Sequence, residues 1–160
     1  MEVNGMEVTP DMYWVLILSG LISLVVRFFY CKTLNKTLKL VAEENRHMQP
    51  KQAWLAMIPI FTIFWNFKIA EALANSLTNE FYDRKIPEEE NPGQAVGLSY
   101  SILFAIGYIP LTPGFIFVMS LFSFIFFIRY WLKVSKFKTL LEEHNKFIES
   151  NESKESIHDS

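Results

Sequence analysis

The chain has 160 residues, the length of one domain, and 51% of them are hydrophobic. Its net charge of −2 gives no basic field of the kind that indicates nucleic-acid binding. Its single cysteine, Cys31, excludes an intrachain disulfide and a CxxC metal or redox motif. The hydrophobic residues are gathered in blocks that carry almost no charge, which predicts an all-α integral membrane protein.

The first block predicts a membrane-spanning helix over about 12–30. Thr9, Pro10 and Asp11 form a favourable helix start, with a capping hydroxyl, a proline at the first helical position and an early carboxylate. No lysine or arginine precedes the block, so we interpret it as a retained span rather than a cleaved signal. Arg27 lies within a turn of its end. Snorkelling to the interface is the simpler explanation for Arg27, and a buried functional cation is the alternative.

The segment 53–67 is apolar but short, and Pro59 interrupts it. A helix of this length is about 22 Å long at roughly 1.5 Å per residue, whereas a hydrocarbon core is about 30 Å thick. The segment is therefore expected either to re-enter on the same side or to form a fourth crossing. A proline, polar groups and charges gather in and just after the break, and they form the candidate functional segment: Pro59, Thr62, Asn66, Lys68 and Glu71.

Beyond the break, an apolar stripe predicts an amphipathic helix over 68–84 that lies along the membrane interface. The loop that follows carries Glu88, Glu89 and Glu90. A divalent cation is one interpretation of these carboxylates, but no loop of EF-hand type surrounds them, which favours a solvated acidic loop.

Two further spans are expected over 95–112 and 114–132, joined by the turn IPLTPG. Small residues in the first of these, such as Gly97 and Ser101, indicate a helix-packing face. Residues 150–160 are rich in Ser, Glu and Asn and are expected to be disordered, leaving 1–149 as a single helical membrane domain. Aromatic and basic residues at the ends of the blocks are typical of membrane-interface anchors: Trp54, Trp65, Arg129, Tyr130, Trp131 and Lys133.

The positive charges favour one topology. Apart from Arg27, the 14 Lys and Arg residues lie in 32–51, in 68–85 and in 129–154. If all four segments cross, at least five of these charges are external in either orientation. If the segment 53–67 re-enters and the N-terminus is outside, all 14 are cytoplasmic. Three full spans plus a re-entrant segment, with a cytoplasmic C-terminus, is the preferred arrangement, and four spans is the alternative.

The segment 53–138 resembles a family of small bacterial multi-span membrane proteins that carry a domain of unknown function. The resemblance is carried by Trp54, Ile58, Pro59, Ile60, Phe61, Trp65, Phe67, Ser76, Leu77, Glu80, Phe81, Arg84, Pro92, Gly93, Gly97, Leu98, Ile109, Pro110, Tyr130, Trp131 and Lys133. It implies a helical architecture and a bacterial inner membrane, and it brings no activity, cofactor or ligand. Similar proteins have Asn at the position of Thr62, so that polar contact is altered here.

No HExxH, GxSxG, GxGxxG or GxxxxGK[ST] pattern occurs, so an enzyme and a cofactor are not expected. The preferred hypothesis is a non-enzymatic inner-membrane protein that acts through protein or lipid contacts, including anionic lipids, as a homo-oligomer or with a membrane-protein partner. The alternative is a subunit of an oligomeric transporter or channel that uses the Pro59-broken segment.

Overall fold

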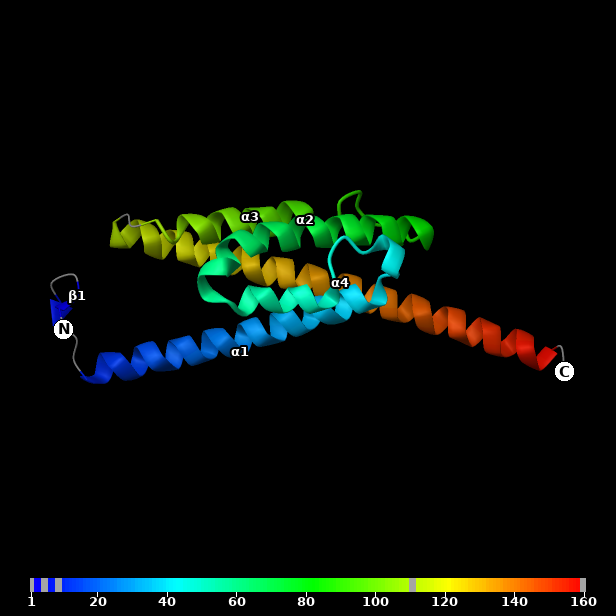
Figure 1. The fold of residues 1–160 in the computed structure, drawn as a ribbon, viewed down its shortest axis with the longest axis horizontal. Coiled ribbons are helices and arrows are strands. Elements are labelled where there is room, and N and C mark those ends of the chain that lie inside the picture. Colours follow the sequence, from blue (N-terminus) through cyan, green and yellow to red (C-terminus); the bar gives the residue numbers. More distant parts are fainter. Residues whose placement is uncertain (1, 4–5, 8–9, 110–111, 159–160) are drawn as a thin grey trace.

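The computed structural model describes residues 2–3, 6–7, 10–109 and 112–158 (Figure 1). Helices make up most of this part of the chain, and its strands are two short antiparallel ones, β1 (Glu2–Val3) and β2 (Met6–Glu7), so the all-α prediction is confirmed. The helices in chain order are α1 (Pro10–Leu40), the 3₁₀ helices η1 (Glu43–Asn45) and η2 (Pro50–Met57), α2 (Pro59–Asp83), α3 (Gln94–Ile106) and α4 (Pro113–His158).

Two of these helices are long and apolar enough to cross a membrane, over Tyr13–Leu40 and Pro113–Asn151. The helix α3 is apolar but has only 13 residues, so three full spans are not confirmed. It ends before the expected boundary because Gly107, a poor helix former, begins a tight turn. In that turn the backbone N–H groups of Tyr108 and Ile109 donate to the carbonyls of Ala105 and Ile106, at 3.1 and 3.0 Å.

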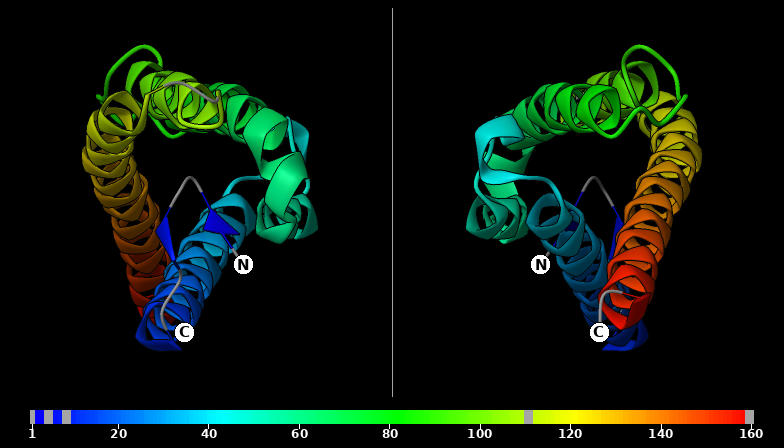
Figure 2. Two further views of the ribbon diagram at one scale, coloured as in Figure 1. Left: turned by 90° about the vertical axis from the view of Figure 1, so that its left-hand side faces the viewer. Right: turned by 90° about the vertical axis from the view of Figure 1, so that its right-hand side faces the viewer.

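The chain reverses direction several times along one long axis (Figure 1). The helix η2 folds back against α1, α2 returns along η2, and α3 then runs back against α2. The helix α4 packs on both α3 and α1. Seen end-on, α4 forms one side of a triangle, α2 with α3 a second, and α1 with η2 the third (Figure 2).

The break expected in the segment 53–67 lies at Ile58, whose backbone is extended between η2 and α2. Pro59 is the first residue of α2 rather than an interruption within a helix, because the N–H that proline lacks has no helical partner at that position. The helix then continues without interruption to Asp83.

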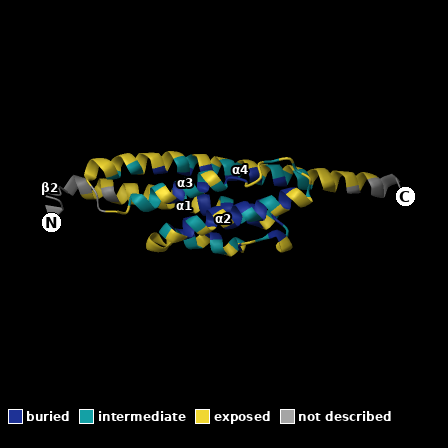
Figure 3. Cartoon of the chain, turned by 90° about the horizontal axis from the view of Figure 1, so that it is seen from above, coloured by how far each residue is buried: buried dark blue, intermediate teal, exposed yellow. Residues whose placement is uncertain are grey.

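The core lies in the middle of the molecule, where α1, α2 and α4 converge (Figure 3). The apolar stripe of α2 is fully covered here, with Ile69, Leu73 and Leu77 each at most 1% exposed. The expected interfacial helix over 68–84 is thus a core helix, which corrects the sequence interpretation. Residues of α1 and α4 that join the same core supply the covering surface: Leu34, Leu38, Val134, Phe137 and Leu141.

The first parts of α1 and α4, residues 13–25 and 113–122, are largely exposed, and we call them the apolar ends. The opposite part of α4 continues as helix to His158, through most of the segment expected to be disordered. No proline or glycine interrupts it there, and the hydroxyls of Ser150 and Ser153 donate to carbonyls three residues back, at 2.8 and 3.1 Å. Residues 159–160 lie outside the described residues.

Candidate functional site

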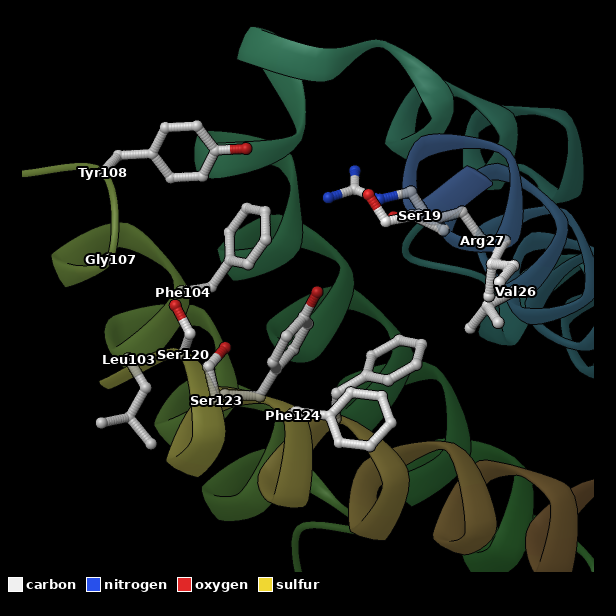
Figure 4. A pocket seen from close by; sticks show the side chains of 14 residues that line it. Ser19, Val26, Arg27, Leu103, Phe104, Gly107, Tyr108, Ser120, Ser123 and Phe124 are labelled. Carbon is white, nitrogen blue, oxygen red and sulfur yellow. The ribbon is translucent and has the colours of Figure 1, made fainter. Parts of the chain in front are cut away.

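A cavity of about 600 Å³ lies between α1, α3 and α4, where the apolar ends meet the core (Figure 4). Its apolar walls come from Ile22 and Val26 of α1, Leu103 and Phe104 of α3, and Phe124 and Phe127 of α4. The volume falls in the range of about 300–1,000 Å³ that is typical of small-molecule sites. We call it the Arg27 cavity, after the charged residue in its lining.

The Arg27 side chain is half-buried and its guanidinium has few partners. Nη1 donates a long hydrogen bond of 3.4 Å to the carbonyl of Ala56 at the end of η2. The guanidinium carbon lies 5.3 Å from the ring centroid of Phe104, a cation–π distance. Arg27 forms no ion pair with any residue that the structure describes, and no described carboxylate lines the cavity. The charge is therefore only partly compensated.

Hydroxyl groups from all three helices complete the lining. Ser19, Ser23 and Arg27 follow one another at intervals of four residues on α1 and so share one face. The other hydroxyls are those of Tyr100 on α3, of Tyr108 in the turn after α3, and of Ser120 and Ser123 on α4. The lining thus combines one cation, several neutral hydrogen-bonding groups and an apolar wall.

The structure brings one residue of the candidate functional segment to this cavity. Asn66 is buried, and its Nδ2 donates to the Tyr100 hydroxyl at 3.3 Å, behind the cavity wall. Thr62 is buried elsewhere on α2, while Pro59 and Glu71 are exposed. Lys68 is also exposed and lies over the ring of Trp65, with Nζ 4.8 Å from its centroid. The segment does not form one site.

The residues expected to be interface anchors are spread over the core and its edge, and their role as anchors stays a prediction. Trp65 is buried and its Nε1 donates to the Gln52 carbonyl at 2.9 Å, whereas Trp54 is 36% exposed. Tyr130 is buried, and its hydroxyl has no hydrogen-bond partner among the described residues. Arg129 is exposed.

A second, smaller cavity of about 360 Å³ lies between α1 and α4 and is strongly basic. Lys32 and Lys36 line it from α1 and Lys138 from α4, and we call it the basic groove. Trp131 also lines it and donates from Nε1 to the Thr33 hydroxyl at 3.1 Å. The groove lies just beyond the apolar part of both helices.

The acidic loop is paired with α4. Glu88 lies 2.7 Å from Lys136 Nζ, and Glu89 lies 2.6 Å from Lys133 Nζ. The Gly93 N–H also donates to Glu89, at 2.7 Å. Partial burial acts to raise the pKa of the Glu89 carboxyl, but these hydrogen bonds and the nearby lysines outweigh it and hold the pKa below its ordinary value. No group of metal-ligating residues occurs in the described parts of the chain.

Sequence reasoning missed a buried polar network centred on Glu80 and Arg84. Glu80 lies in the last turn of α2 and Arg84 caps the end of that helix, and their side chains are only 3% and 16% exposed. The available signal was their i, i+4 spacing, which permits an ion pair on one helix face. Their partners on α1 and α4 are distant in sequence, so the spacing alone gives no indication of burial.

Comparison with known protein families, with curated proteins and with solved structures found no match for this chain.

Proposed function

We propose that this chain is a non-enzymatic integral membrane protein whose cytoplasmic surface acts through contacts with anionic lipids and partner proteins. The observation that carries the proposal is the exposure of its two long apolar helices. Only 12% and 17% of their most apolar windows are buried within the fold. A core helix of a soluble protein is mostly buried, whereas these two helices are not. We therefore infer that lipid rather than water covers their apolar faces.

The exposed side chains are large as well as apolar. On α1, Trp14, Val15 and Leu18 are at least 60% exposed, and on α4 Phe117 is 68% exposed. A bilayer covers such surface at no cost in unsatisfied polar groups, because the helix backbone is hydrogen-bonded internally. The charged and paired residues of α2, the acidic loop and α4 lie away from the apolar ends.

The path of the chain supports three crossings and a re-entrant segment. The starts of α1 and α4 lie at the same end of the molecule, and α4 ends at the other (Figure 1). The reversal between η2 and α2 lies partway along the long axis in that view, short of the start of α1. In the proposed arrangement α3 crosses together with the turn that follows it. The N-terminus is external and all cations other than Arg27 are cytoplasmic.

The basic groove is the proposed contact with anionic lipid. Lys32, Lys36 and Lys138 line it where α1 and α4 leave the apolar region, which in the proposed arrangement is the depth of the lipid headgroups. Each such cation near an anionic leaflet contributes about 1 kcal/mol, and salt screens the attraction.

Membrane sidedness tests the topology. Glu90 is exposed, and its side chain, unlike those of Glu88 and Glu89, forms no ion pair with a described residue, so a single cysteine is best placed there. Cys31 is buried and is replaced by alanine. With C31A/E90C in intact cells, we expect a membrane-impermeant maleimide to label only after lysis. Labelling before lysis would contradict the proposed topology, and recovery of the protein in the soluble fraction would contradict membrane insertion itself.

The lipid contact is tested in reconstituted vesicles. We expect the preference of the protein for phosphatidylglycerol over phosphatidylcholine to weaken with added salt and to fall further in K32Q/K36Q/K138Q. The matched control is K39Q/K51Q/K146Q, because these three lysines are exposed and none of them lines the groove. An equal effect of the two sets of substitutions would exclude the groove as a specific contact.

A further inference from the structure

We propose that the Arg27 cavity binds one anionic amphiphile, with the guanidinium on a phosphate headgroup and an acyl chain against the apolar wall. The proposal rests on the proposed membrane location and adds to it a defined site with one lipid. It differs from the basic groove in position, in burial and in the expected response to salt.

The first argument is the charge. An arginine has five N–H donors in a rigid fork that matches the oxygens of a phosphate or carboxylate. In this structure Arg27 donates one long hydrogen bond, to the Ala56 carbonyl, and makes a cation–π contact with Phe104. It forms no ion pair with a described residue. A half-buried cation whose N–H donors are not all used carries a desolvation cost in free energy, which a bound anion offsets. The lining therefore selects a negatively charged ligand.

The second argument is the depth. Arg27 precedes Lys32, the first cation of the basic groove, by about 7.5 Å along α1 at roughly 1.5 Å per residue. If the groove lies at the headgroup level, Arg27 lies just beneath it, within reach of a lipid phosphate. A freely soluble anion would have to leave water to reach that depth, whereas a lipid phosphate already resides near it.

The third argument is the shape. From Arg27 the cavity continues along α1 as far as Ser19, about 12 Å at the same rise per residue, in the direction of the apolar ends. Ile22 and Val26 line this course on α1, and Phe124 lines the cavity from α4 (Figure 4 labels Val26 and Phe124). An acyl chain attached to a phosphate at Arg27 would follow these apolar walls.

The hydroxyls around the cavity fit the polar part of the same ligand. Ser23 lies one turn from Arg27, and Ser123 is buried on the facing helix. Such groups donate to phosphate and ester oxygens without adding charge. A metal cation or an organic cation is disfavoured, since no described carboxylate lines the cavity and Arg27 would repel it.

The test uses the full-length protein in phosphatidylcholine vesicles that contain a trace of spin-labelled phosphatidylglycerol or spin-labelled phosphatidylcholine. The fraction of motionally restricted label gives the relative association of the two lipids. High salt is present throughout, to screen the exposed basic groove. We expect a preference for phosphatidylglycerol that persists in high salt, and we expect R27Q to reduce that preference at least about tenfold, as for loss of a charged hydrogen-bonded pair.

Two further variants separate binding from folding. S23L keeps the Arg27 charge but adds bulk at an exposed position of the cavity lining, and we expect it to lower the preference as well. K51Q removes an exposed cation that lies outside both the cavity and the basic groove, and we expect no change. Unaltered helical circular dichroism in each variant confirms that it is folded.

Three results would overturn the proposal. The first is an unchanged lipid preference in R27Q or S23L, and the second is an equal loss in K51Q. The third is displacement of the labelled lipid by inorganic phosphate alone at millimolar concentration, which would assign the cavity to a soluble anion. Labelling of E90C is an independent readout, so a wrong topology and an empty Arg27 cavity are distinguishable.

Discussion

The guanidinium of Arg84 and the carboxylate of Glu80 lie 2.6 Å apart within the core. The same carboxylate accepts a hydrogen bond from the backbone N–H of Ala42 at 2.9 Å. The guanidinium donates to the Leu40 carbonyl at 2.9 Å and to the Asn145 side chain. One ion pair at the C-terminal end of α2 thus joins the end of α1 to the second half of α4.

We expect E80Q to lower the free energy of unfolding by about 3–5 kcal/mol, because it leaves the buried Arg84 charge without its counter-ion. Thermal melting in a mild detergent, followed by circular dichroism, measures the loss. The control is E43Q, since that carboxylate is 90% exposed and its ion pair with Arg46 is long, at 3.4 Å. Equal melting temperatures for the two variants would contradict a structural role for the buried pair.

We expect G97A to destabilise the fold by roughly 1–3 kcal/mol, even though alanine is the better helix former. A Cβ atom at this position would lie 2.8 Å from the Cβ of Ala70 and 2.8 Å from the Tyr130 ring, which is too close. The matched control is G20A, where nothing lies within 4 Å and the same substitution is expected to be neutral or stabilising. A melting temperature for G97A at or above the wild-type value would show that α3 is not closely packed.

The ion pair of Glu89 gives the stability a dependence on pH. Because the pKa of this carboxyl is lower in the folded protein than its ordinary value of 4.5, its contribution is complete above that value. It is lost as the pH falls through the lower pKa of the folded state. We therefore expect E89Q to melt below the wild type near neutral pH, and the two melting curves to converge in acid. If the melting temperatures of E89Q and the wild type differed by the same amount at every pH, titration of Glu89 would be excluded as the cause of the pH dependence.

We expect P59A to change stability by less than about 1 kcal/mol, because Pro59 is exposed and no helical hydrogen bond is missing at the first position of α2. The contrasting variant is F64P, which places a proline at an exposed position inside the same helix. We expect it to lower the free energy of unfolding by about 3 kcal/mol or more. If P59A were as destabilising as F64P, Pro59 would have a structural role beyond the start of α2.

Patterns within one segment allowed much of the secondary structure to be predicted. Pro10 and Pro113 begin α1 and α4, and the apolar blocks after them are helical, since a charge-free block of this length has few alternatives. The position of the break next to Pro59 also follows from local backbone chemistry. The end of α3 at Ile106 did not, because a hydropathy pattern does not distinguish a helix from the apolar turn that follows it.

What covers an apolar face depends on distant segments. The stripe that contains Ile69 and Leu73 has the spacing of an interfacial helix, and the structure covers it with protein rather than lipid. Hydrophobic periodicity identifies the buried side of a helix but not its partner. The Arg27 cavity was missed for the same reason, since its lining comes from three helices. Arg27 itself was recognised as a possible buried cation, but its surroundings were not.

The helix α4 is a single rod from Pro113 to His158, and beyond Gly114 its described course contains neither glycine nor proline. Its part beyond Tyr130 is about 42 Å long at roughly 1.5 Å per residue. If this part moves as a rigid rod, a tilt of about 5° around Tyr130 displaces its far end by about 4 Å, given the length obtained from the rise per residue. The first half of this rod forms one wall of the Arg27 cavity. A ligand that binds in the cavity and tilts this wall would therefore displace the C-terminal end of α4.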